Sequence, residues 1–143
     1  MLSSWALSKI QNEADEFVDK VCKRQMLVND SSMNIMTPDH TLAKKLGVPS
    51  GEGLIKCVDN SLRGNGSCGF IITERGIYCK AWLGITKHFI SFERLARVSE
   101  ITVSIGNVEA DGELVASIDN FYGRILCEMI ENIRDIARQD LGM

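Results

Sequence analysis

The sequence has little of what defines several specialised classes of protein. Its 143 residues include two prolines, and aromatic residues make up 6% of the chain. So little proline excludes a proline-rich linker protein and a collagen-like chain. No hydrophobic run approaches the roughly 20 residues that cross a bilayer, and the first charge is not followed by the apolar segment of a secretory signal. We therefore expect a cytoplasmic protein with no integral membrane segment.

Cysteine and histidine are too few, and wrongly spaced, for a structural metal centre. The five cysteines include no C-x-x-C pair, and His40 and His88 lie far apart in the sequence. Neither a zinc site nor a disulfide framework is predicted, and we expect no metal and no cofactor. Most cysteines adjoin apolar residues, as Cys22 adjoins Val21. This is typical of reduced thiols that pack as small hydrophobic groups in a reducing compartment.

An excess of positive charge is also missing. The formal net charge is -3 and the sequence pI is about 5.4, whereas proteins that bind duplex nucleic acid have a high pI and a basic face. Nucleic acid is therefore not an expected partner. Residues 98–143 carry nine acidic and three basic side chains. The acidic face of the last helix is either solvated or recognises a basic partner, and in the second case the candidate residues are Glu128, Glu131 and Asp135.

The apolar pattern predicts one α+β protein of two parts. Apolar residues at steps of three and four predict a helix from Ser3 or Ser4 to Lys23, and Pro38 to Leu46 predicts a short second helix. Residues 1–48 form this helical extension. Residues 49–143 are the main domain, a curled antiparallel sheet of six to seven strands. The predicted strands are 54–58, 69–73, 77–82, 87–92, 100–105 and 113–118, with turns at 74–76 and 110–112.

A long amphipathic helix follows the predicted strands. Asp119 is its predicted N-cap, and its apolar stripe runs from Phe121 to Ile136, with the end of the helix near Gly142. Such a helix is the expected cover for the apolar face and open end of the sheet.

A glycine-rich segment, residues 64–69, matches G-x-G-x-x-G but lacks the context of a dinucleotide site. In that site the glycines open a helix, whereas here a strand is predicted to follow. The same segment is similar to the nucleophile turn of viral chymotrypsin-like cysteine proteases, with Cys68 as the nucleophile. That chemistry needs a histidine beside the thiol, carried by a preceding barrel, and the preceding 67 residues are predicted to be largely helical. A Cys68 hydrolase therefore remains a minor alternative.

The turn after the third predicted strand is unusually apolar. Trp82, Leu83 and Ile85 surround one glycine there, with Lys80 and Lys87 on either side. These apolar side chains belong either to the core or to an exposed tip that contacts a partner, since exposed apolar patches mark interaction sites.

The stretch from Asp59 to Tyr78, with its G-F-I-I-T-E-R-G-I-Y segment, and the I-S-F-E-R-L segment that follows resemble bacterial pleckstrin-homology-like domains. The resemblance covers about residues 50–138. It implies a curled antiparallel sheet plugged at one end by the C-terminal helix, in a binding or assembly module rather than an enzyme. Relatives that bind phosphoinositides do so through several basic residues of the first hairpin. This loop offers Arg63 alone, so phosphoinositides are not an expected ligand.

The leading hypothesis is a non-catalytic module that recognises a protein partner, or a second copy of itself, through a sheet edge, the Trp82–Ile85 tip or a helix groove. An exposed edge can accept an added strand. One alternative is a small immunity or antitoxin protein whose acidic last helix neutralises a basic toxin, since complementary charge speeds encounter. The other alternative is the Cys68 hydrolase.

Overall fold

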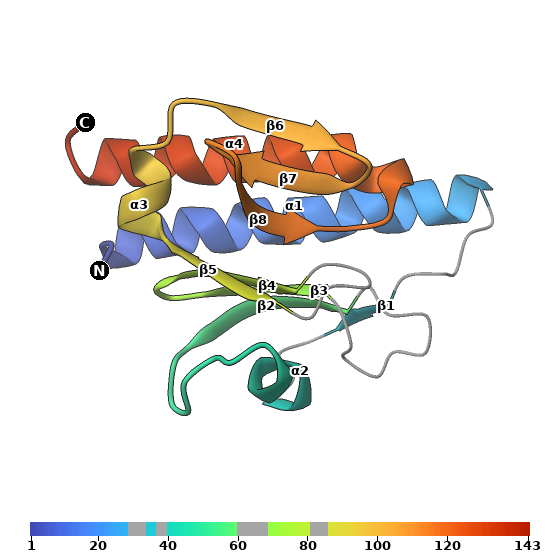
Figure 1. Cartoon of the computed structure of the whole chain (residues 1–143), viewed down its shortest axis with the longest axis horizontal. Coiled ribbons are helices and arrows are strands. Elements are labelled where there is room, and N and C mark those ends of the chain that lie inside the picture. The colour runs from blue at the N-terminus through green and yellow to red at the C-terminus, as the bar shows by residue number, and fades with distance from the viewer. Residues whose placement is uncertain (29–33, 37–39, 60–68, 81–85) are drawn as a thin grey trace.

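The computed structural model describes residues 1–28, 34–36, 40–59, 69–80 and 86–143, which form helices and two antiparallel sheets (Figure 1). We call them sheet A, with strand order β1-β2-β3-β4-β5, and sheet B, with order β6-β7-β8. The predicted α+β class, with antiparallel strands and helices at both ends, is confirmed. The helices are α1 (Ser4–Val28), α2 (His40–Lys45), α3 (Phe92–Ala96), the 3-10 turn η1 (Asn120–Tyr122) and α4 (Gly123–Asp140). The strands are β1 (Asn34–Met36), β2 (Leu54–Asp59), β3 (Gly69–Thr73), β4 (Gly76–Lys80), β5 (Lys87–Ser91), β6 (Ile101–Ser104), β7 (Asn107–Ala110) and β8 (Glu113–Ser117).

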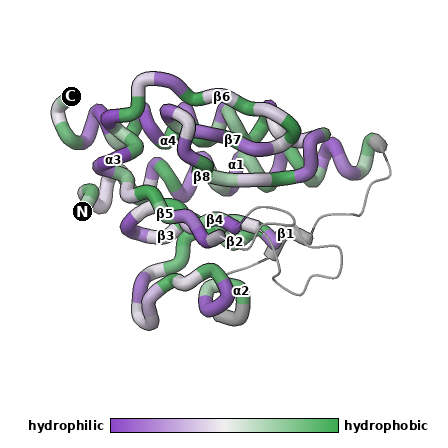
Figure 2. The backbone as a smooth tube through the Cα atoms, in the orientation of Figure 1, coloured by the Kyte–Doolittle hydropathy of each residue, from purple (hydrophilic) through white to green (hydrophobic). Residues whose placement is uncertain are grey.

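Helix α1 lies between sheet A and α4 (Figure 1). Both long helices alternate between hydrophobic and hydrophilic residues along their length, as amphipathic helices do (Figure 2). The Phe17 ring of α1 packs edge-on against the Phe70 ring of β3, with centroids 5.9 Å apart. At the other side of α1, Asn132 of α4 donates a hydrogen bond to Glu13. Helix α1 therefore shares its core with the sheets and with α4 of the same chain. Its buried stripe consists of Ala6, Ile10, Ala14, Phe17 and Val21.

Sheet A is covered on both faces, which explains the unbroken apolar run Phe70–Ile72 in β3. Every residue of β3 is buried. Alternate residues of this strand face α1 on one side and α2 on the other. The α2 side carries a row of cross-strand partners that forms a second, smaller hydrophobic cluster with Leu42 and Leu46. The row consists of Cys57, Ile71, Tyr78 and Phe89.

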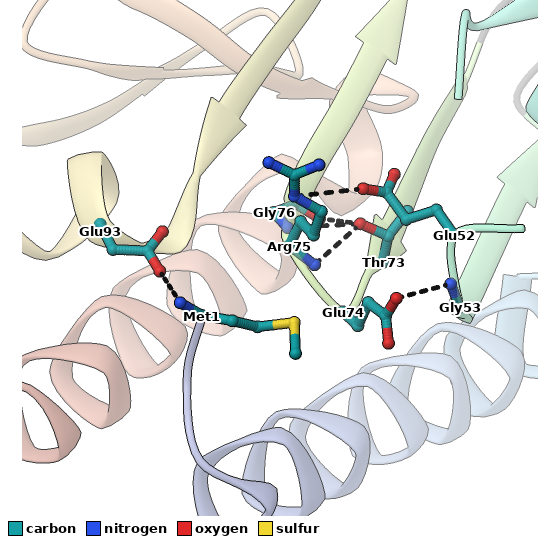
Figure 3. A network of polar contacts seen from close by, with 8 residues as sticks. All are labelled: Met1, Glu52, Gly53, Thr73, Glu74, Arg75, Gly76 and Glu93. Carbon is teal, nitrogen blue, oxygen red and sulfur yellow. Dashed lines mark hydrogen bonds and ion pairs between the residues drawn. The ribbon is translucent and has the colours of Figure 1, made fainter. Parts of the chain in front are cut away.

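Two-residue turns join the neighbouring strands of three hairpins. Between β3 and β4, the Thr73 hydroxyl oxygen accepts hydrogen bonds from the backbone N–H groups of Arg75 (3.1 Å) and Gly76 (3.3 Å), which fixes the turn (Figure 3). The turn between β7 and β8 is Asp111-Gly112. Both turns lie where the sequence predicted them.

Several details differ from the sequence-based expectation. The predicted strand 87–92 was wrong in its last residue, because the Ser91 side chain accepts a hydrogen bond from the Arg94 N–H and starts helix α3 there, with Phe92 buried in the core. The predicted strand 100–105 was wrong at its end, because Ile105 belongs to a turn. Strands β1 and β7 were not predicted at all.

The predicted strands separate into two sheets rather than one. Strand β8 of sheet B lies against β4 of sheet A. Within the described residues no strand pairing joins the two sheets, so they do not close on each other. No helix formed by these residues combines the length and the hydropathy needed to cross a membrane.

Candidate functional site

Strand β6 lies at an open edge of sheet B. Among the described residues it pairs with β7 alone, and its residues after Ile101 are all exposed. The register pairs Val103 with Val108, so Val103 belongs to the face of the sheet that looks toward α4. At the edge its side chain remains 38% exposed. An edge of this kind presents backbone N–H and C=O groups to which another chain can add a strand.

The turn that follows β6 holds Ile105 in a backbone conformation that is unfavourable for a β-branched residue. Ile105 has φ of 52° and Gly106 has φ of 77°, which is the pattern of a type I′ turn. A β-branched residue at positive φ is an outlier, and the left-handed conformation costs roughly 1–2 kcal/mol for an L-residue. The Ile105 side chain gains little burial in return, because it is 80% exposed. Figure 2 shows the turn as a hydrophobic segment at the end of sheet B.

The β7–β8 hairpin of sheet B has the same kind of turn, but with a residue that tolerates positive φ in place of the isoleucine. Asp111 and Gly112 have φ of 49° and 85°, nearly the values at the first turn. Aspartate tolerates the left-handed conformation because its short polar side chain makes local hydrogen bonds. The two turns therefore share a backbone geometry. Ile105 is not needed for this geometry, since an aspartate forms the second turn with the same conformation.

Phe121 extends the apolar surface from the turn to the start of α4. It lies in η1 and is 49% exposed. The turn and η1 are adjacent, because a Cβ added to Gly123 would lie 3.2 Å from the Cα of Gly106 and 3.1 Å from a Val103 methyl group. We call Val103, Ile105 and Phe121 the β6–η1 patch.

Arg24 of helix α1 lies at the border of the β6–η1 patch. The Arg24 guanidinium lies over the Phe121 ring, 4.8 Å from its centroid, and the ring packs edge-on against Tyr122. A cation above an aromatic face is attracted to it. These two contacts hold the ring in place while half of it stays accessible.

Asp111 positions the start of β6. Its carboxylate accepts hydrogen bonds from the backbone N–H groups of Glu100 (2.9 Å) and Ser99 (3.1 Å), and its own N–H donates to the Glu100 carbonyl. Because these N–H groups stabilise the charged form, the pKa of Asp111 lies below its usual value. The turn between β7 and β8 thus anchors the open edge.

The hydrogen bonds of the Asp111 carboxylate make the free energy of unfolding depend on pH. The pKa of Asp111 is lower in the folded than in the unfolded chain, so its contribution is present above about pH 4 and is lost as the pH falls through the folded pKa. Asp111→Asn keeps a residue that tolerates positive φ but removes the charge. We expect the variant to be less stable than the wild type near neutral pH, with a difference in free energy of unfolding that narrows as the pH falls below about 4. Urea unfolding at several pH values measures this, and a difference that stays constant would contradict it.

The acidic residues predicted on the last helix lie on α4 at steps of three and four, so they share one face of that helix but differ in exposure and in their partners. Glu128 is exposed and lies beside Glu13 and Glu16 of α1. Glu131 is half-buried and accepts a hydrogen bond from the Cys127 thiol. Asp135 is exposed and pairs with Arg134 at 3.5 Å.

The remaining predicted site residues lie outside the described residues. These are Arg63, Cys68, Trp82, Leu83 and Ile85, together with the glycine-rich segment as far as residue 68, whereas Gly69 begins β3. The predictions attached to them, the apolar tip and the cysteine nucleophile among them, stay predictions.

Two sequence-based assignments are corrected here. Phe121 was expected on the buried stripe of the last helix, but α4 begins at Gly123, so Phe121 falls outside the helical phase. Cys22 was expected to pack among apolar residues, but it is exposed, whereas Cys57, Cys79 and Cys127 are buried. Burial and the neighbouring Glu131 raise the pKa of the Cys127 thiol to about 11. Within the described part of the chain, no group of three acidic, cysteine or histidine side chains is placed to hold a metal ion.

Comparison with known proteins gives no family for the chain. A scan against protein-family models found no match, and searches of curated proteins and of solved structures found none either.

Proposed function

We propose that this chain is a non-catalytic protein-binding module, and that it takes its partner at the open edge of β6 and on the β6–η1 patch. The partner contributes an extended segment that pairs with β6 and carries an apolar side chain onto Ile105 and Phe121. The observation that carries the proposal is Ile105, an exposed apolar residue held in a conformation that costs the fold free energy. Strain and apolar exposure at one position are typical of residues kept for binding.

The arrangement of elements supports a pleckstrin-homology-like domain as the framework of this module. Such a domain is expected to have a meander of antiparallel strands followed by a helix, and the chain has this order from β2 to α4. In this proposal sheets A and B are the two halves of an open, curled sheet, and α4 is the helix that covers it. The Trp82–Ile85 tip and Arg63 are further candidate contacts of the same module.

Replacing Ile105 with asparagine tests the proposal, because it separates binding from folding. Asparagine tolerates positive φ, so we expect Ile105→Asn to raise the free energy of unfolding by about 1 kcal/mol. Binding should weaken at least tenfold. The ligand for this measurement is a peptide selected from a random library on the wild-type protein, with its affinity measured by calorimetry and the β6 amides followed by hydrogen exchange.

A matched control removes an exposed apolar residue from the opposite end of the molecule. Leu141 is 41% exposed and follows the last residue of α4. Figure 1 shows the C-terminal end of α4 far from the β6–β7 turn. Leu141→Ser should leave peptide affinity unchanged. Selected peptides that bind Ile105→Asn as tightly as the wild type, or that leave hydrogen exchange in β6 unchanged, would overturn the proposal. A wild-type protein that dimerises, with loss of the dimer in Ile105→Asn, would identify the partner as a second copy.

A further inference from the structure

A cleft of about 850 Å³ opens on the side of the molecule that carries α2. It is lined by the end of α2 and by the segment that leads from Gly47 to Leu54 in β2, Glu52 included. This cleft borders the smaller hydrophobic cluster beneath α2 and does not involve the β6–η1 patch. It is large enough for a small ligand.

The carboxylate of Glu52 is buried without the hydrogen bonds that a buried charge needs. Its side chain is 3% exposed, and neither carboxylate oxygen accepts a hydrogen bond of normal geometry from the described residues, although the Tyr78 hydroxyl lies close to the carboxylate. The Arg75 Nε lies 3.6 Å from the nearer oxygen, beyond hydrogen-bonding distance, and the Arg75 side chain is 65% exposed (Figure 3). A buried carboxylate costs free energy unless donors compensate for the lost water.

The surroundings of Glu52 suit a positively charged group. The Tyr78 hydroxyl is close to Glu52, and burial together with this carboxylate raises the pKa of Tyr78 to about 12, so the hydroxyl stays protonated. The Tyr78 ring packs against the Phe89 ring, with centroids 4.4 Å apart, in the hydrophobic cluster beneath α2. Carboxylates are the groups that proteins use to bind ammonium and guanidinium ions. Lys44 also lines the cleft, but it is exposed, so water screens its charge.

We propose that the cleft binds a small molecule through a guanidinium or primary ammonium group that donates to Glu52 the hydrogen bonds it lacks. The rest of the ligand lies along the apolar lining of the cleft. Arg75 is the internal competitor of the ligand, because its guanidinium approaches the same carboxylate from the solvent side. This site is separate from the partner surface proposed above and does not depend on it.

Agmatine, which carries both a guanidinium and an ammonium group, is the first probe. Binding is measured by calorimetry on the full chain, and butylurea, a neutral molecule of similar shape, is the control ligand. Putrescine and acetyl-arginine amide form two further arms, which distinguish a free amine from an arginine side chain as the source of the cation. We expect agmatine to bind at least tenfold more tightly than butylurea. Equal affinities, or no binding of any cationic probe, would overturn the proposal.

Three variants test the residues. Glu52→Gln removes the charge and keeps the shape, and it should weaken agmatine binding at least tenfold. Glu74→Gln is the matched control, because Glu74 carries the same charge nearby but accepts a hydrogen bond from the Gly53 N–H. The affinity of this variant for agmatine should equal that of the wild type. Arg75→Met removes the competitor and should tighten binding several-fold. Unchanged affinity in Glu52→Gln or in Arg75→Met would overturn the proposal, and the second variant keeps the test valid if the first does not fold.

Discussion

Replacing Gly106 with alanine should destabilise the protein by about 3 kcal/mol or more and lower Tm by roughly 10 °C. Two effects add at this position. Gly106 has a φ of 77°, which alanine adopts only at a cost, and a Cβ there would lie 2.0 Å from the Ile118 carbonyl oxygen and 3.0 Å from the Asn120 nitrogen. Both neighbours are backbone atoms, so they cannot rotate away. The segment that leads into α4 would have to move, and thermal unfolding followed by circular dichroism measures the loss.

Gly112 provides the control for this prediction. It occupies the same position of the second turn with a φ of 85°, but a Cβ there would have nothing within 4 Å. Gly112→Ala should therefore cost only the backbone term, about 1 kcal/mol. Equal losses in the two variants would show that the close approach of Gly106 to the segment after β8 does not matter.

Replacing Thr73 with valine should cost about 2 kcal/mol, because the change removes the acceptor of two backbone N–H groups. Thr73 and Gly76 are buried, so the Gly76 N–H in particular loses its partner with no access to water. The hydroxyl also fixes the turn that carries Arg75 toward Glu52 (Figure 3). Urea unfolding measures the effect.

Thr73→Ser separates the hydroxyl from the methyl group. Serine keeps the acceptor and loses one methyl, for which we expect a cost of about 1 kcal/mol or less. A serine variant as unstable as the valine variant would assign the effect to packing of the methyl group and contradict the hydrogen-bond explanation.

The parts of the fold that the sequence predicts are those with a strong periodic signal. Helix α1 repeats apolar residues at steps of three and four over most of its length, and the turn at Asp111-Gly112 contains residues suited to positive φ. Strand β7 escaped prediction because Val108 and Ala110 are its only apolar residues, too few to show an alternation. Helix α3 has five residues, too short for a helical period to emerge. The division into two sheets depends on which strand edges pair, and a single sequence carries no signal for that.

The candidate site was harder to predict than the fold, because its residues are distinguished by conformation and burial rather than by type. Ile105 looks like the end of an alternating strand until its φ is known. Glu52 is an ordinary acidic residue between glycines until its side chain is seen to be covered. The acidic residues of α4 show the converse: their charge and shared helix face are obvious in the sequence, but only the structure shows that Glu131 is half-buried beside the Cys127 thiol.

The packing of α1 against α4 has a consequence for synthesis of the chain. Roughly 100 residues separate these helices, so at about 5–20 residues per second the ribosome makes α4 some 5–20 s after α1. Until then only β2 and its neighbours in sheet A can shield the apolar stripe of α1. During this interval the face of α1 that α4 later covers stays accessible to the chaperones at the ribosomal exit.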